Sequence, residues 1–496
     1  MKRLNKDLLE ELRVQSAGIA LPGYDRSQKK IGIVHLGIGA FHRAHQAVYT
    51  DKVMAASGGD WGILGVSLRS AAVREQLAPQ DGLYTVLERG SAGDAYSVIG
   101  SVLALAVAPE NPGAVIDAMA DSEVKIVSLT VTEKGYCHDP ASGNLNLSHP
   151  DIVHDLKNIT EPKTAIGFIV AALAKRREQG TKSFTAMSCD NLPNNGKVLK
   201  NCVLQFAKSF DEALAMWIAS NTSFPCTMVD RIVPATTDAD RDALEKALAY
   251  RDEGVVCAEP FSQWVIEDDF CNDRPGWEEC GALIAKDVEL YEKMKLRLLN
   301  GSHSLLAYCG YLAGKETISD VMQEAAFVNM CTRFMTREVG ETLQTPNGFD
   351  IEKYQGELRE RFANPGLRHR TWQIAMDGSQ KIPQRWLEGL RVQLSGKGHI
   401  DIYCLGLAAW IRYVSAVDEK GNAIDVQDPL AKKLKSLHEQ HGDNAAELVN
   451  AFLAIDEVFS DDLQDQESVV LAVCTWLDKI NERGMLAVIK ESFGSH

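Results

Sequence analysis

Four residues whose side chains can transfer a proton or form hydrogen bonds lie close together in the sequence: Glu292, Lys295, Asn300 and His303. At about 100° per residue, an α-helix would place Glu292, His303 and Asn300 roughly 60°, 80° and 140° from Lys295 around its axis. They share one side if Gly301 leaves the helix intact. A lysine desolvated among the neighbouring leucines has a lowered pKa and can act as general acid and base for an alcohol proton.

The neighbouring polar side chains could support that proton transfer. Asn300 can donate a hydrogen bond to an oxygen that gains negative charge, His303 can hold a substrate hydroxyl, and Glu292 can pass protons to water. Asn191 is a second amide donor, because it follows a predicted strand at 183–188, and α/β sheets bind ligands beyond their strand ends. The alternative is that these are cap and surface residues around a helix break at Asn300-Gly301.

A glycine turn near the start of the chain indicates a nucleotide site. The residues Gly37, Ile38, Gly39, Ala40 and Phe41 lie between a predicted buried strand at 31–36 and an amphipathic helix at 41–54. They match the first two glycines of the dinucleotide turn, whereas His42 stands where the third would be. An ordinary strand-to-helix turn remains the alternative.

The residue that would contact the cofactor ribose is less clear. NAD sites usually place Asp or Glu about 20 residues after the turn, at the end of the second strand. Here Arg69 follows that predicted strand, in Ser67-Leu68-Arg69-Ser70. Arg69 could meet the 2′-phosphate of NADP or lie on a solvated helix start. NAD is the expected cofactor, and NADP is left open.

The elements that position these residues change character along the chain. In the first half, predicted strands alternate with predicted helices, which indicates a doubly wound α/β fold; the strands are 31–36, 61–68, 125–130 and 183–188, and the helices are 112–120, 165–178 and 196–206. From about residue 285 helical patterns prevail, at 288–299, 302–312, 352–362, 367–376, 405–414 and 465–482. The second half is therefore predicted to be mainly α-helical.

Composition limits the classes of partner. The chain has 496 residues and a net charge of −16, so a general nucleic-acid or acidic-membrane surface is not expected. No run approaches the roughly 20 apolar residues of a membrane helix, and the charged start does not resemble a secretory signal. We expect a cytoplasmic monomer or small homo-oligomer. The 11 cysteines include no CxxC pair, and His42 and His45 lack a third ligand nearby, so no metal site is predicted.

Six segments strongly resemble the mannitol dehydrogenase family of polyol-specific long-chain dehydrogenases: GIGAFHRAH (37–45), SLTVTEKGY (128–136), SCDNLPNNG (188–196), FPCTMVDRIVP (224–234), EPFSQWVIED (259–268) and KLRLLNGSH (295–303). The resemblance implies a Rossmann-type dinucleotide-binding domain, taken as 1–284, and an α-helical substrate-binding and catalytic domain, taken as 285–496. It also implies metal-free catalysis by Lys295 with Asn191 and Asn300, and substrate binding by His303.

The substrate helix departs from the polyol-oxidising members, which carry arginine where this chain has Gln373. The segment RHRTWQIAMDGSQK (368–381) resembles the branch that reduces D-fructuronate to D-mannonate. A uronate carries a carboxylate that arginine binds in bidentate fashion, so Arg368, Arg370, Lys381 and Arg385 predict an anion pocket. On a helix, Arg368 and Arg370 point about 200° apart, so one of them is expected to reach the substrate. The alternatives are tagaturonate, a neutral polyol such as mannitol or arabinitol, or a catalytically silent nucleotide-binding redox sensor.

Overall fold

The computed structural model describes residues 2–15, 18–90, 93–139, 143–346, 348–442, 444–460 and 462–494. The chain forms two compact units, Met1–Glu289 and Leu290–His496. The division falls a few residues after the boundary expected at 284. Strand β13 (Leu283–Ala285) keeps this segment with the first unit, because it pairs in parallel with β12 (Gln263–Glu267).

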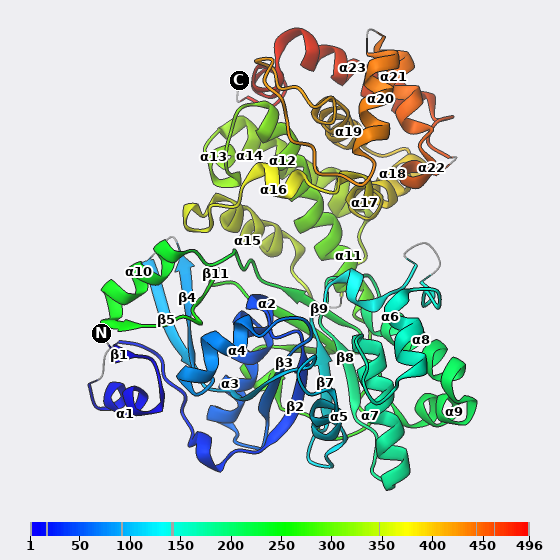
Figure 1. Ribbon diagram of the computed structural model, residues 1–496. Helices are drawn as coiled ribbons and strands as arrows, with labels where there is room; N and C mark the ends of the chain where they lie inside the picture. The colour runs from blue at the N-terminus through cyan, green and yellow to red at the C-terminus, as the bar shows by residue number, and fades with distance from the viewer. Residues whose placement is uncertain are drawn as a thin grey trace. The chain divides into compact units, whose positions relative to one another are not determined.

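The first unit is built on a parallel five-stranded sheet in the order β6-β3-β2-β7-β8. The strands are β2 (Ile31–Leu36), β3 (Gly62–Ser67), β6 (Val102–Val107), β7 (Ile126–Leu129) and β8 (Thr185–Ser188). In chain order, this sheet starts at central β2, adds β3 and β6 on one side, and then adds β7 and β8 on the other (Figure 1). The predicted doubly wound fold is confirmed, and its order reverses between β2 and β7, where such sheets bind ligands.

Helices cover both faces of this sheet. Val34 and Leu36 of β2 pack on one face with α5 (Pro112–Ala120), α7 (Ala165–Gln179) and α8 (Asn195–Phe210). Ile33 points to the opposite face and packs with α3 (Gln46–Ala56). Because both faces are buried, the strands are nearly continuous apolar runs, which is why they could be located from the sequence.

The first unit also contains smaller sheets and further helices. Two small sheets have the orders β11-β4-β5 and β13-β12-β9, and β1 pairs with β10. Their strands are β1 (Lys2–Arg3), β4 (Tyr84–Gly90), β5 (Gly93–Ile99), β9 (Thr227–Asp230), β10 (Tyr250–Arg251) and β11 (Val256–Ala258); the helices are α1 (Lys6–Gln15), α2 (Ala40–Ala44), α4 (Ala72–Leu77), α6 (Pro150–Lys157), α9 (Glu212–Asn221) and α10 (Asp238–Leu248). The helix expected at 41–54 is divided into α2 and α3 at His45, whose φ of −129° and ψ of −90° are not helical.

The second unit is mainly α-helical, as predicted, and its described residues contain no strand beyond isolated bridges. Its helices are α11 (Glu289–Met294), α12 (Ser302–Leu312), α13 (Ile318–Met322), α14 (Ala325–Arg333), α15 (Ile351–Ala363), α16 (Thr371–Ala375), α17 (Gly378–Ile382), α18 (Glu388–Gly396), α19 (Asp401–Tyr413), α20 (Ala431–His441), α21 (Ala445–Leu453), α22 (Asp456–Phe459), α23 (Glu467–Arg483) and α24 (Met485–Phe493). Three π-helical stretches interrupt them: η5 (Lys295–Gly301), η6 (Phe334–Val339) and η9 (Pro383–Leu387).

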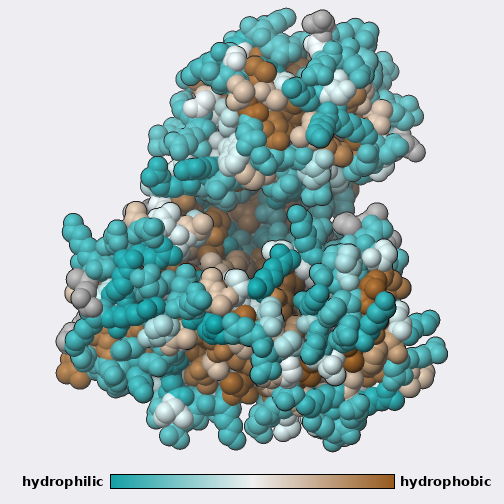
Figure 2. Space-filling view, in the orientation of Figure 1, coloured by the Kyte–Doolittle hydropathy of each residue, from teal (hydrophilic) through white to brown (hydrophobic). Residues whose placement is uncertain are grey.

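Hydrophilic residues cover most of the visible face of each unit, and hydrophobic residues form small patches (Figure 2). Across the described ranges, no helix has both the length and the apolar composition that a membrane span needs.

Candidate active site

The loop after β2 makes a tight turn that requires glycine at its first position. Gly37 has a φ of +94°, and a Cβ there would lie 2.2 Å from the carbonyl oxygen of Thr130, just beyond β7. Gly39 caps the N-terminus of α2, and a Cβ on it would have no neighbour closer than 3.9 Å. The backbone at Gly39 therefore faces open space, as the close approach of a pyrophosphate requires.

The other predicted cofactor contacts of this turn differ in exposure. Ile38 is only 2% exposed, and its side chain fills the space that Gly65 leaves on β3, so it packs the turn against the sheet. Ala40 and Phe41 are half-buried at the start of α2. The surface that the turn offers to a ligand is thus formed by Gly39, Ala40 and Phe41.

His42, in place of the third glycine, lies in the core and stacks on His35 of β2 with ring centres 3.4 Å apart. The His35 ring nitrogens lie 2.8 Å from Ser128 Oγ and 2.9 Å from Thr130 Oγ1. Burial lowers the pKa of His35 to about 3 and the pKa of His42 well below its ordinary value, so both rings are neutral. The stacked pair attaches α2 to the sheet, where a third glycine would otherwise allow close helix–strand packing.

No carboxylate that could accept a hydrogen bond from a ribose hydroxyl lies at the end of β3. Arg69 follows this strand and is exposed. Arg74 on α4 is held in a bidentate ion pair by Glu110. Of the two arginines, Arg69 is therefore the one that is open to a ligand.

Asn191 lies shortly after the carboxyl end of β8 and is exposed, so the sheet presents it at the same edge as the glycine turn. The preceding Asp190 accepts hydrogen bonds from the backbone amides of Val131 at 3.0 Å and Thr132 at 2.8 Å. One carboxylate thus ties the ends of β7 and β8 together.

In the second unit, Glu292, Lys295, Asn300 and His303 lie on one continuous helical segment formed by α11, η5 and α12. Glu292, Lys295 and His303 are 7%, 8% and 8% exposed, and Asn300 is half-buried. The expectation of α-helical spacing was wrong, because Lys295 to Gly301 form a π-helix. A π-helix uses i→i+5 hydrogen bonds and turns less per residue, which changes the angles between these side chains.

The π-helical stretch is held by the segment that contains η9. The indole of Trp386 donates to the carbonyl oxygen of Gly301 at 3.0 Å. Arg385 donates to Ser304 Oγ at 2.7 Å and to the carbonyl oxygen of Asn300 at 3.3 Å. A Cβ on Gly301 would lie 3.1 Å from the carbonyl oxygen of Arg385, so the two segments pack tightly there. Such π-bulges are frequent at functional sites.

A cluster of cationic and imidazole side chains surrounds His303. The His303 ring stacks on Phe362 at 5.1 Å and meets the His369 ring edge-on at 4.6 Å. Burial lowers its pKa well below the ordinary value, and four positive or protonatable neighbours lower it further: His369, Arg385, Arg361 and Lys381. His303 is therefore neutral, and one of its nitrogens can accept a hydrogen bond while the other donates.

Two cations of this cluster have no direct carboxylate partner. Burial lowers the pKa of Lys381 to about 8 and the pKa of Arg385 to about 10. Lys381 donates to the carbonyl oxygens of Met376 at 2.5 Å and Ile374 at 3.3 Å. In the described part of the chain, neither Lys381 nor Arg385 forms an ion pair. Partly buried, unpaired positive charge is costly, and an anionic ligand would compensate it.

A helix was expected at 367–376, but Arg368 and Arg370 lie outside the helices that the structure has there. Arg368 has a left-handed backbone with φ +42° after η8 (Pro365–Leu367), and Arg370 precedes α16 and forms an isolated bridge with Thr317. The expected opposition of about 200° therefore does not apply. Both side chains are exposed, whereas the intervening His369 contacts His303.

Sequence reasoning missed His369, Phe362 and Arg361 as neighbours of His303. Phe362 and Arg361 are buried side chains of α15, far along the chain from His303. No local pattern signals that contact. In the ranges that the structure describes, no group of three or more His, Cys, Asp and Glu residues is placed to hold a metal ion.

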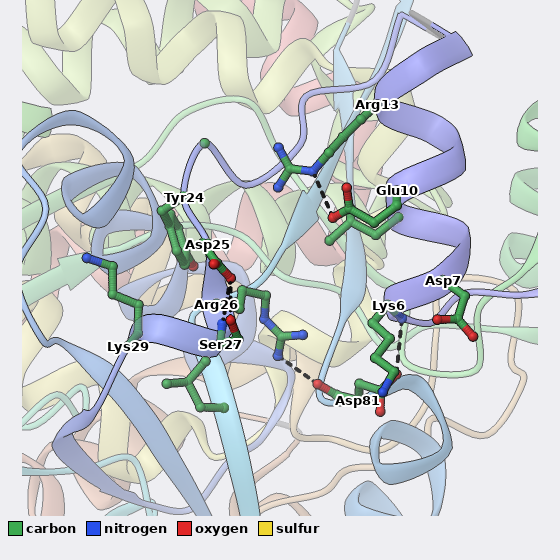
Figure 3. A pocket seen from close by; sticks show the side chains of 13 residues that line it. Lys6, Asp7, Glu10, Arg13, Tyr24, Asp25, Arg26, Ser27, Lys29 and Asp81 are labelled. Carbon is green, nitrogen blue, oxygen red and sulfur yellow. Dashed lines mark hydrogen bonds and ion pairs between the residues drawn. The ribbon is translucent and has the colours of Figure 1, made fainter.

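A hollow of about 980 Å³ lies elsewhere in the first unit, beside α1 and the turn at Asp25–Ser27 (Figure 3). Its charged side chains are of both signs: Lys6, Arg13, Arg26 and Lys29 against Asp7, Glu10, Asp25 and Asp81. Arg26 already donates to the carbonyl oxygens of Gly100, Asp81 and Val102. Leu103 lines the hollow from the start of β6, so it lies at the amino edge of the sheet, away from the glycine turn.

Comparisons with known proteins agree along nearly the whole chain. Residues 31–279 match the mannitol dehydrogenase Rossmann domain, and residues 287–481 match the mannitol dehydrogenase C-terminal domain. The chain is 49% identical to the D-mannonate oxidoreductase of Escherichia coli K12, over 94% of this chain and 96% of that protein. It is 41% identical to a mannitol 2-dehydrogenase of Pyricularia oryzae, over 95% of both. The structure of Pseudomonas fluorescens mannitol 2-dehydrogenase with NAD and D-mannitol superposes with a TM-score of 0.87 at 38% identity, covering 99% of each chain.

Proposed function

Because the chain belongs to the mannitol dehydrogenase family, we propose that it is an NAD(H)-dependent oxidoreductase that interconverts D-fructuronate and D-mannonate. As a member of this family it is an oxidoreductase that acts on a CH–OH group. The observation that carries the uronate assignment is the positive charge of Lys381 and Arg385 beside His303. A uronate carboxylate would neutralise it, whereas a neutral polyol would not.

The glycine turn of the first unit fits a dinucleotide. The Cα of Gly39 faces open space at the start of α2, and the backbone amides there can receive a pyrophosphate. When bound, NADH supplies the hydride that reduces the keto carbon. Arg69 is exposed just beyond β3, where a residue that contacts the ribose is expected, so NADPH is a cofactor to be tested beside NADH.

The substrate is held by the cationic cluster. Lys381 and Arg385 bind the carboxylate, and neutral His303 binds a substrate hydroxyl as donor or acceptor. Arg368 and Arg370 are exposed, so they attract the anion and contact it at the rim. These assignments follow from charge and burial.

The proton is delivered by Lys295. As the keto oxygen gains negative charge, the side-chain amides of Asn191 and Asn300 donate hydrogen bonds to it and the Lys295 ammonium protonates it. Glu292, buried one helical turn before Lys295, passes the replacement proton from water. In the oxidative direction neutral Lys295 removes the alcohol proton.

The first test is the absorbance of NADH with purified protein and each of D-fructuronate, D-tagaturonate and D-fructose, repeated with NADPH. Rapid oxidation with D-fructuronate is the expected result. A clear preference for D-tagaturonate or D-fructose would contradict the assignment. Absence of turnover with every substrate would favour a silent redox sensor.

A neutral polyol is the second candidate substrate. The 41% identity to a mannitol 2-dehydrogenase supports it, whereas Gln373 in place of the arginine of polyol-oxidising members speaks against it. D-Mannitol with NAD⁺ tests this candidate directly. We propose that the protein works in the cytoplasm as a monomer or small homo-oligomer. Light scattering would determine the oligomeric state.

A further inference from the structure

Thr132, in the loop after β7, has a backbone conformation that is nearly confined to glycine. Its φ is +64° and its ψ is 165°. A β-branched residue is rare in this region, because its Cβ substituents crowd the backbone. Such strain persists only where the surrounding structure holds it, and it is common where a protein binds a ligand.

The group that holds Thr132 is the carboxylate of Asp190, at the end of β8. Its Oδ1 accepts from the Thr132 amide at 2.8 Å, and its Oδ2 accepts from the Val131 amide at 3.0 Å and from the Tyr136 hydroxyl at 2.8 Å. Tyr136 closes the short helix η3 (Glu133–Tyr136) that follows Thr132. Asp190 is therefore bonded on both sides of the strained residue.

All three donors to Asp190 are neutral. Asp190 is 8% exposed, and burial raises its pKa above the ordinary value, although these hydrogen bonds offset part of that rise. A buried carboxylate that uses its oxygens on backbone amides and a phenol acts through geometry rather than through pairing with a cation.

The loop that Asp190 holds also contacts the glycine turn. Thr130 Oγ1 donates to the carbonyl oxygen of Gly37 at 2.8 Å, and the carbonyl oxygen of Thr130 leaves no room for a Cβ on Gly37. The backbone of Asp190 is itself anchored, since its carbonyl oxygen accepts from the Leu192 amide and the Asn195 side chain, both at 2.9 Å. Asn191 lies between Asp190 and Leu192 in the chain, so the hydrogen bond that joins these two residues also restrains its backbone.

We propose that Asp190 is a positioning residue that holds Thr132 in its strained conformation and thereby sets both the loop against the glycine turn and the direction of the Asn191 side chain. This inference rests on the proposed function, in which Asn191 donates to the reacting oxygen. Neither Asp190 nor Thr132 is assigned a contact with the substrate.

The test is a cycle of Asp190→Asn, Thr132→Gly and the double variant. In Asp190→Asn an NH₂ group meets donors, so the loop relaxes to an unstrained conformation. We expect kcat to fall on the order of a hundredfold, as for a displacement of about 1 Å in an active site. Glycine adopts positive φ without a steric penalty. Adding Thr132→Gly to Asp190→Asn should therefore restore kcat by about tenfold or more.

Asp252 provides the matched control, because it is a buried carboxylate with the same kinds of partner in the same unit. It accepts from the backbone amides of Thr85 and Gly254 and from the Gln80 side chain. Asp252→Asn and Asp190→Asn should both lower the melting temperature, but Asp252→Asn should keep kcat per NADH-binding site within about threefold of the wild type. NADH titration by fluorescence provides the number of sites.

Two results would overturn the proposal: Asp190→Asn with wild-type kcat per site, or a double variant no faster than Asp190→Asn. Equal kcat losses in Asp190→Asn and Asp252→Asn would also overturn it, since they would indicate a general effect of destabilisation. The wild-type assay separates this proposal from the proposed function. If the wild-type protein oxidises NADH with none of the substrates, the proposed function fails before any variant is compared.

Discussion

Lys295 combines burial with a position where the helix is wound as a π-helix. Methionine has a similar length, so Lys295→Met keeps most of the packing and removes the proton donor. We expect kcat to fall by about 10²- to 10⁴-fold. NADH affinity should not change, because Lys295 is assigned to the keto oxygen of the substrate and not to the cofactor. Steady-state rates and NADH fluorescence titration measure the two quantities.

Lys293 supplies the control for this substitution. It lies on the same helix but is exposed, and Lys293→Met should retain turnover. Normal kcat in Lys295→Met would remove Lys295 from the mechanism.

The lowered pKa of Lys381 predicts that substrate affinity depends on pH. Burial and the neighbouring Arg385 lower its pKa to about 8, against weaker opposing effects of Asp377 and Asp428. The protonated amine attracts a carboxylate and the neutral amine does not, so affinity is lost as pH rises through this value. We expect the ratio of KM for D-fructuronate to KM for D-fructose to rise by up to about tenfold between pH 7 and pH 9.

Using the ratio of the two KM values cancels any effect of pH that both substrates share. Lys381→Met should remove the pH dependence of the ratio and raise it at pH 7. A ratio that is flat in the wild-type protein would argue against Lys381 as a carboxylate ligand.

The π-helical stretch η5 depends on tertiary hydrogen bonds for its shape. Trp386→Phe removes the donor to the buried carbonyl of Gly301. Loss of this partner should destabilise the second unit by about 1–3 kcal/mol and lower its melting temperature by several degrees. It should also reduce kcat, because Asn300 and Lys295 lie on the loosened turn. Calorimetry and steady-state kinetics check the two effects.

Trp372→Phe is the matched control. Its indole donates to the carbonyl oxygen of Asp425 near the surface, where water can replace it. A loss of stability as large as that of Trp386→Phe would show that indole removal in general, and not support of η5, is responsible.

The same stretch illustrates the limit of helical periodicity. The order of residues from Glu292 to His303 indicated a helix with one polar side, and the structure has a continuous helical segment there. The α-helical angles were wrong, because the wider winding is stabilised by Trp386 and Arg385 from another part of the chain. Similarly, the predicted helix at 367–376 does not include Arg370, which instead forms a bridge with Thr317.

For the whole molecule, the position of the cofactor site can be tested against the hollow beside α1. The carboxyl edge of the parallel sheet holds the glycine turn, and the hollow lies at the amino edge. Saturating NADH should slow hydrogen exchange at 37–45 and 129–133 and leave α1 unchanged. Protection confined to α1 would move the cofactor site to the hollow.

The sequence by itself determined the class of fold and the chemistry of the proposed site. Buried parallel strands are uninterrupted apolar runs, and the glycine turn and the Lys295 segment are local patterns, so β2, α5 and α12 could be located from their residues alone. It also placed Asn191 at a strand end.

Only the tertiary structure decided which distant groups meet. The contact of His303 with His369 and Phe362, and the hydrogen bond of Asp190 to Thr132, each join residues far apart in the chain. Local propensity carries no information on such contacts, because they depend on how strand ends and helices pack. The strained Thr132 is the clearest case, since its conformation opposes its own local preference and exists because Asp190 holds it.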